Sequence, residues 1–271
     1  MSPAPATGPL NTRDSVATEL RTLGLRPGES VLVHSSLSAL GWVCGGASAV
    51  VAALLDVLGP RGTLVVPTHT AENSDPAGWV NPPVPREWWP VIRAETPAYD
   101  PATTRSFHVG VVPETVRTWP GAARSAHPQT SFAAVGPRAQ AIVADHAPDC
   151  RMGERSPLAH LEAAGARVLL LGVGYDSCSA FHLAEYRIPG PRGDNSFAAM
   201  TPAGRRWITV RDVEVDDDRF DELGAAFERE HPVARGTVGA ADARLFALPD
   251  AVAYAEGWLA RHRPYAATAE R

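Results

Sequence analysis

The chain has 271 residues, of which 45% are hydrophobic and 20% charged, and its formal net charge is -5 at pH 7. This composition is typical of a soluble globular protein, and the negative charge argues against non-specific nucleic-acid binding while mildly favouring a cationic partner. The three cysteines are scattered and form no Cys-x-x-Cys pair, which excludes a disulfide framework and favours the cytoplasm. No apolar segment approaches the roughly 20 residues that a membrane span needs. We therefore predict a cytoplasmic protein that binds neither nucleic acid nor membrane.

The N-terminal third alternates between helices and buried strands. Residues 1–10 are predicted to be a disordered leader, and residues 11–271 a single domain, because no interior linker interrupts them. Helix, strand, glycine loop, helix and strand follow one another in this region, which indicates an α/β fold. We expect a central mixed, largely parallel sheet flanked by helices. The elements are a helix at 12–23, a strand at 30–34, a helix at 47–58 and a strand at 63–66.

Residues 68–105 differ from the rest, since they are rich in proline and tryptophan and lack clear periodicity. A loop of that length is usually functional or disordered, and the aromatic residues favour function, so we predict an inserted substrate loop. The strand at 207–215 alternates strictly and is predicted to be exposed or at a sheet edge. The other predicted elements are helices at 110–119, 137–146, 156–164, 218–230 and 249–261, strands at 131–135 and 168–171, and mixed loop and strand at 234–246.

The stretch 167–187 combines a buried strand with a polar helix. The strand ends at Gly172 and Gly174, and the following helix holds His182 and Glu185 three residues apart on one face. An imidazole beside a carboxylate is a plausible proton acceptor at neutral pH. From this spacing alone, a structural histidine bonded to a neighbouring backbone group is the more common outcome.

The loop at 34–46 joins three serine hydroxyls to three glycines immediately before a helix. Glycines let backbone amides approach a ligand, and a helix start favours anionic groups, so the loop suits a phosphorylated cofactor. A plain connecting loop is the alternative. The chain has no Gly-x-Gly-x-x-Gly here and no Gly-Lys-Ser/Thr, Gly-x-Ser-x-Gly or His-Glu-x-x-His motif. The dinucleotide, P-loop, serine-hydrolase and zinc-protease patterns are therefore excluded.

Acidic residues gather in the strand that ends near residue 216. Alternation places Asp212, Glu214 and Asp216 on one face, where they repel each other unless a cation lies between them. A polyamine substrate supplies such a cation. An exposed edge strand whose charges prevent aggregation explains the pattern equally well. Glu72 and Asp75 add carboxylates to the inserted loop.

Several of these stretches together resemble one family, the aminoglycoside 3-N-acetyltransferases, also called the antibiotic N-acetyltransferase family. Each segment is short, but their order and spacing are specific and extend over nearly the whole chain. The matching segments are residues 33–46, 62–69, 98–101, 110–115, 124–128, 131–134, 169–172, 182–185 and 235–240.

The resemblance implies the fold of that family and acetyl transfer from acetyl-coenzyme A to the 3-amino group of a 2-deoxystreptamine aminoglycoside, which gives antibiotic resistance. It implies that His182 is the catalytic histidine. Because an amine attacks a thioester only after losing its proton, we expect His182 to be the general base of a direct attack, with no covalent intermediate, and we expect no metal. The coenzyme contacts that it implies are His34, Ser35, Ser36, Ser38, Gly41, Trp42, Val43, Phe107, His108, Val109 and Gly110.

The resemblance also implies how the drug is held. Asp212 and Glu214 match acidic positions that bind substrate amines or support the histidine, so Glu185 and Glu214 compete to orient His182. The other implied substrate contacts are Glu72, Asp75 and Trp79. A related N-acetyltransferase that acts on a different amine metabolite is the alternative function. A monomer and a homodimer both remain open.

Overall fold

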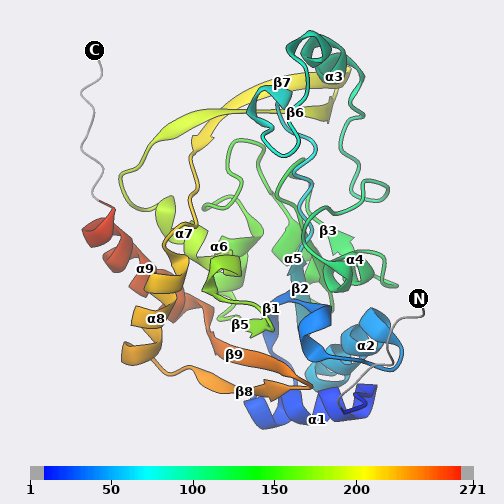
Figure 1. Ribbon diagram of the computed structural model, residues 1–271, viewed down its shortest axis with the longest axis vertical. Coiled ribbons are helices and arrows are strands. Elements are labelled where there is room, and N and C mark those ends of the chain that lie inside the picture. The colour runs from blue at the N-terminus through cyan, green and yellow to red at the C-terminus, as the bar shows by residue number, and fades with distance from the viewer. Residues whose placement is uncertain (1–8, 264–271) are drawn as a thin grey trace, which may run out of the picture.

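The computed structural model describes residues 9–263, and its centre is one seven-stranded sheet (Figure 1). The strand order across this sheet is β3-β4-β2-β1-β5-β9-β8. The strand bounds are β1 Ser30–Ser35, β2 Thr63–Pro67, β3 Ala123–Arg124, β4 Phe132–Val135, β5 Arg167–Leu171, β8 Ala234–Val238 and β9 Ala241–Ala247.

Parallel pairing is confined to the middle of the sheet. β1 pairs in parallel with β2 and β5, whereas β4 runs antiparallel to β2, and β9 runs antiparallel to β5. The prediction of a mixed sheet is confirmed, but the prediction that it is largely parallel was wrong. The residues at 234–246, expected to mix loop and strand, form the hairpin β8–β9. Strand periodicity identifies a strand but not its direction, which is why this difference was not predicted.

Helices cover both faces of the sheet. In β5, Val168 and Leu170 face one hydrophobic core while Leu169 and Leu171 face the other, as expected for a strand buried on both faces. One face is covered by α1 Arg13–Leu23, α2 Gly46–Leu58 and α4 Val111–Arg117. The other is covered by α5 Ala139–Val143, α6 Pro157–Ala163, α7 Ala180–Glu185, α8 Phe220–Glu230 and α9 Leu248–His262.

Most predicted helices are present, with shifted ends. The Thr12 side chain caps α1 by accepting the amide of Ser15, as its residue type predicts. The helix predicted at 137–146 is shorter, and the one predicted at 218–230 begins at Phe220 with no side-chain cap from Asp218. No helix within residues 9–263 is long and apolar enough to cross a bilayer.

The inserted segment 68–105 is partly helical and packs on a separate hairpin, formed by β6 Arg192–Thr201 and β7 Gly204–Val213. Both lie at the top of Figure 1, away from the N-terminal helices. Asn73 joins the two parts, because its side chain donates to the carbonyl of Ala198 (2.9 Å) and accepts the amide of the same residue (2.8 Å). The short helices within the segment are η2 Pro76–Gly78, η3 Arg86–Trp88 and α3 Trp89–Glu95.

Candidate active site

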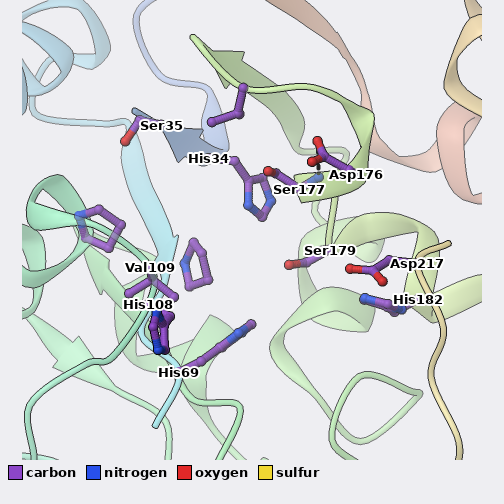
Figure 2. Close-up of a pocket in the computed structure, with 13 residues that line it drawn as sticks. His34, Ser35, His69, His108, Val109, Asp176, Ser177, Ser179, His182 and Asp217 are labelled. Carbon is purple, nitrogen blue, oxygen red and sulfur yellow. Dashed lines mark hydrogen bonds between the residues drawn. The ribbon is translucent and has the colours of Figure 1, made fainter. Parts of the chain in front are cut away.

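A cleft of about 430 Å³ opens at the carboxyl ends of the three parallel strands (Figure 2). This is the edge where α/β sheets commonly bind ligands. His34 and Ser35 are the last two residues of β1, and His69 lies two residues beyond the end of β2. Other lining residues follow β5. The lining residues are His34, Ser35, Pro67, His69, His108, Val109, Pro113, Val173, Asp176, Ser177, Ser179, His182 and Asp217.

His182 enters this cleft from α7, which follows β5 after the single turn η4 Tyr175–Ser177. Its Nδ1 lies 2.7 Å from Oε2 of Glu185, one helical turn along. A carboxylate only accepts, so Nδ1 is the donor and Nε2 is left as the unprotonated nitrogen of the neutral ring. The side chain of His182 is 14% exposed, so the ring is held yet accessible from the cleft. This geometry suits a general base.

Glu185 is fixed from three directions. Besides His182, its carboxylate accepts from Nη1 of Arg263 (2.6 Å) and from the amide of Asp216 (3.1 Å). The Glu185 and Arg263 side chains are both at least nine-tenths buried. Arg263, the residue immediately after α9 Leu248–His262, therefore helps to hold the carboxylate that is bonded to His182.

Glu214 does not reach His182. Its carboxylate is exposed and lies beside Gly193, where an added Cβ would sit 2.4 Å from Oε1 of Glu214. Of the two carboxylates that the sequence left in competition, the structure brings Glu185 to the imidazole and leaves Glu214 on the hairpin. The interpretation of Glu214 as the partner of the histidine was wrong.

Asp212 is also displaced from its predicted role. It is fully buried, and its carboxylate accepts from the hydroxyl of Tyr186 (2.8 Å) and the amide of Arg151 (2.9 Å). β7 ends at Val213, so the expected acidic face of three alternating residues does not form. With its oxygens used inside the protein, Asp212 has none to offer a substrate amine, and that interpretation was wrong.

Most of the predicted coenzyme contacts line a second cleft, of about 700 Å³. It adjoins the first, since Ser35, His108 and Val109 line both. It also lies at the start of α2, where Gly45 and Gly46 have positive φ values of 84° and 56° that favour glycine. The predicted residues in it are Ser35, Ser36, Ser38, Gly41, Trp42, Val43, His108, Val109 and Gly110. Of the other two predicted contacts, His34 lines the first cleft and Phe107 a third.

The third hollow, of about 440 Å³, lies under the inserted segment and again includes His108. Glu72, Trp79 and Phe107 line it, so two of the predicted substrate residues lie beside the first cleft. Asp75, the third predicted substrate residue of this segment, does not lie beside the first cleft. Its Oδ1 accepts hydrogen bonds from the amide of Ala77 and from Nη2 of Arg93 (2.7 Å). Asp75 caps η2 and lines a different hollow, against the hairpin.

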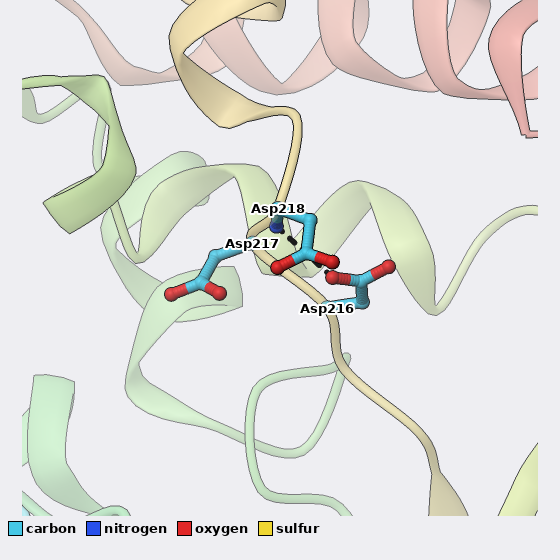
Figure 3. Close-up of side chains that lie close together, drawn as sticks. All are labelled: Asp216, Asp217 and Asp218. Atoms are coloured by element: carbon cyan, nitrogen blue, oxygen red, sulfur yellow. Dashed lines mark hydrogen bonds between the residues drawn. The ribbon is translucent and has the colours of Figure 1, made fainter.

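The sequence reasoning missed two cleft carboxylates, Asp176 and Asp217, which line the cleft with His182 (Figure 2). Asp217 belongs to the exposed acidic run Asp216–Asp218, whose ligand-type oxygens lie within 4.8 Å of one another (Figure 3). Three consecutive aspartates were a visible signal in the sequence. Exposed acidic groups commonly occur without an ion, so the run by itself is not a metal centre.

Four buried histidines have strongly lowered pKa values. Burial lowers the pKa of His34 and of His69 to about 3, and the nearby His182 contributes in the same direction. Burial likewise lowers the pKa of His127 and of His146 to about 3. An apolar setting disfavours the charged ring, so all four are neutral at physiological pH.

Comparison with known proteins decides the family. The family model described as aminoglycoside 3-N-acetyltransferase matches residues 32–260. The chain belongs to the aminoglycoside 3-N-acetyltransferase family. It is 46% identical, over 91% of its length and 92% of the relative, to the aminoglycoside N(3')-acetyltransferase-like protein YokD of Bacillus subtilis (strain 168). It is 41% identical to the aminoglycoside N(3)-acetyltransferase VII of Streptomyces paromomycinus, over 93% and 92% of the two chains.

Solved structures of this family confirm the fold. The crystal structure of the Bacillus subtilis YokD protein matches with a TM-score of 0.93 and 42% identity, over 96% of this chain and 97% of that one. A structure described as AAC-IIIb binary with CoASH matches with a TM-score of 0.83 and 33% identity, over 94% and 98%. The predicted family, its fold and its acyltransferase class are therefore confirmed for the chain.

Proposed function

We propose that this acyltransferase moves the acetyl group of acetyl-coenzyme A to the 3-amino group of a 2-deoxystreptamine aminoglycoside, which gives resistance to the drug. The observation that supports it most is the position of the His182–Glu185 pair in a cleft that adjoins the one lined by nine predicted coenzyme contacts. The names of the curated relatives and the coenzyme in the AAC-IIIb structure point the same way.

In the proposed mechanism, His182 is the general base. An amine attacks a thioester only as its neutral form, so Nε2 of His182 takes the proton while Glu185 stabilises the resulting imidazolium. The imidazolium then returns the proton to the coenzyme sulfur as the carbon–sulfur bond breaks. The attack is direct. Cys178 is not a nucleophile, because it is fully buried and burial raises the pKa of its thiol to about 12.

The coenzyme and the drug approach the base from opposite sides. The serines and glycines before α2 bring backbone amides to the coenzyme, and the helix start favours its phosphates. Trp42, which is 54% exposed beside them, offers an aromatic face. The carboxylates of Asp176 and Asp217 hold the ammonium groups of the drug, and Trp79 lines the hollow into which its other rings extend. We place the reaction in the cytoplasm, which the three free cysteines support.

The test is release of coenzyme thiol from acetyl-coenzyme A in the presence of gentamicin, kanamycin, apramycin or simple amines, followed by NMR location of the acetyl group. Turnover with an aminoglycoside at the 3-amino position supports the proposal. Turnover with simple amines alone would replace it by the alternative, an N-acetyltransferase for another amine metabolite.

A variant separates the role of the base from coenzyme binding. We expect His182→Ala to abolish turnover while its dissociation constant for coenzyme A stays near that of the wild type, since no second-cleft contact is removed. Near-normal turnover by His182→Ala would exclude His182 as the base. In cells, only the wild type should raise the inhibitory concentration of the drug.

A further inference from the structure

The first cleft holds two more histidines besides the base. His34 is the fifth residue of β1, and His69 lies two residues beyond the end of β2, the parallel neighbour of β1. Both line the cleft with His182, and Figure 2 shows the three rings arranged around its interior. The proposed mechanism leaves His34 and His69 without a chemical task.

Both rings have an unsatisfied nitrogen. Nε2 of His34 and Nε2 of His69 are buried and have no hydrogen-bond partner among the described residues, and the hydroxyl of Ser35 shares this property. A buried polar group without a partner costs about 1–3 kcal/mol. Three such groups at one cleft indicate that polar groups of a bound ligand supply the missing hydrogen bonds.

The surroundings of the two rings keep them uncharged. Burial is the main cause of the lowered pKa of both rings; His182 lowers the pKa of His34 further, and neighbouring histidines and Arg124 lower that of His69 further. His182 differs, since its Nδ1 is bound to Glu185. A neutral imidazole can donate one hydrogen bond without giving up its proton, whereas an imidazole paired with a carboxylate is suited to accept one. The cleft therefore contains one imidazole paired with a carboxylate and two neutral imidazoles, each able to donate one hydrogen bond.

We propose that His34 and His69 form the oxyanion hole of the acetyl transfer, each donating one N–H to the thioester oxygen. This inference rests on the proposed function, and it assigns to side chains a role that backbone amides near the glycine loop could otherwise have. The alternative, in which the rings only fill space, leaves two buried ring nitrogens without a hydrogen-bond partner among the described residues.

The step balances in atoms and charge. The amine nitrogen forms a bond to the thioester carbon, and the electron pair of the C=O π bond moves onto oxygen, where His34 and His69 stabilise it. His182 accepts the amine proton. The C=O bond then re-forms, the carbon–sulfur bond breaks, and the coenzyme thiolate takes the proton from His182. Neither His34 nor His69 gains or loses a proton.

The experiment compares leucine and glutamine at both positions. His34→Leu and His69→Leu remove the donor, and we expect each to lower kcat by about 10²–10³, the usual effect of losing one oxyanion donor, with the KM for acetyl-coenzyme A changed by less than about threefold. His34→Gln and His69→Gln keep an N–H near the Nε2 position, and we expect each to retain at least about a tenth of the wild-type kcat. The pH dependence of kcat should keep its shape in all four.

The control is His160→Leu, which makes the same substitution on α6, outside the three clefts. Circular dichroism and thermal melting show which variants fold. If a leucine variant does not fold, the kcat of the glutamine variant at the same position still tests the inference. Unchanged kcat in the folded leucine variants, or a loss confined to KM, overturns the inference. If the wild type acetylates no amine, the proposed function fails. Attack of water on acetyl-coenzyme A passes through the same oxyanion, so hydrolysis measured in the same variants then tests the donors: a rate lowered by the leucine variants supports the inference, and a rate that they leave unchanged, or no hydrolysis by the wild type, overturns it.

Discussion

We expect this protein to lose stability as the pH falls below about 6.5, at pH values above those at which carboxylates titrate. The pKa values of His34, His69, His127 and His146 are lowered by burial from 6.5 to about 3. Between these two values the unfolded chain binds more protons than the folded one, so stability rises with pH in that window. The contribution of each histidine is complete above about pH 6.5 and is lost as the pH falls toward 3.

The size of the effect follows from the same values. Lowering the pH from about 7.5 to about 5.5 costs about 1.4 kcal/mol for each histidine that must stay neutral, and about 5 kcal/mol for all four. Because domains are stable by only about 5–15 kcal/mol, this loss would remove a large part of the folding free energy. The two cleft histidines and the two structural ones contribute equally to it.

Urea unfolding followed by tryptophan fluorescence at the two pH values measures this loss. His146→Gln removes one titrating group and should reduce the difference between the two pH values by about a quarter. Ser125→Ala is the matched control, because it removes the hydroxyl bonded to Nδ1 of His146 (2.9 Å) and keeps the histidine. It should lower stability similarly at both pH values. Equal unfolding free energies of the wild type at the two pH values would refute the reasoning.

Two further substitutions test packing and burial by urea unfolding. Gly224→Ala should destabilise the protein by at least about 1–3 kcal/mol, because its Cβ would lie 1.9 Å from the ring of Tyr175. Gly257→Ala, where the nearest atom is the end of a flexible arginine at 3.4 Å, should instead be neutral or stabilising by up to about 1 kcal/mol, and the opposite order would contradict this account. Asp212→Asn should cost about 1–3 kcal/mol, since Asp212 is bonded to Tyr186 inside the protein. A raised substrate KM with unchanged stability would restore its role in amine binding.

The parts of the site that lie close together in the sequence could be predicted from it. His182 and Glu185 are three residues apart on one helix, so their pairing follows from helix geometry alone. The serine and glycine loop before α2 was predicted to bind a ligand for the same reason, and its residues line one cleft as neighbours in the chain.

The parts of the site that depend on tertiary contacts could not be predicted from the sequence. His69 lines the same cleft as His34 only because β1 and β2 are adjacent in the sheet. The hydrophobic periodicity of a sequence does not reveal the order of strands in a sheet. Asp212 has the alternation expected of an exposed strand, yet Tyr186 and the amide of Arg151 bury its carboxylate. The direction of β9 was missed in the same way, because pairing is decided by segments far away in the chain.

The contact between Arg263 and Glu185 has a practical consequence for anyone who handles this enzyme. Arg263 directly follows α9 and is 78 residues from Glu185 in the sequence, yet its guanidinium binds the carboxylate that is paired with His182. A substitution or truncation that removes Arg263 therefore takes away part of the support of the carboxylate paired with His182.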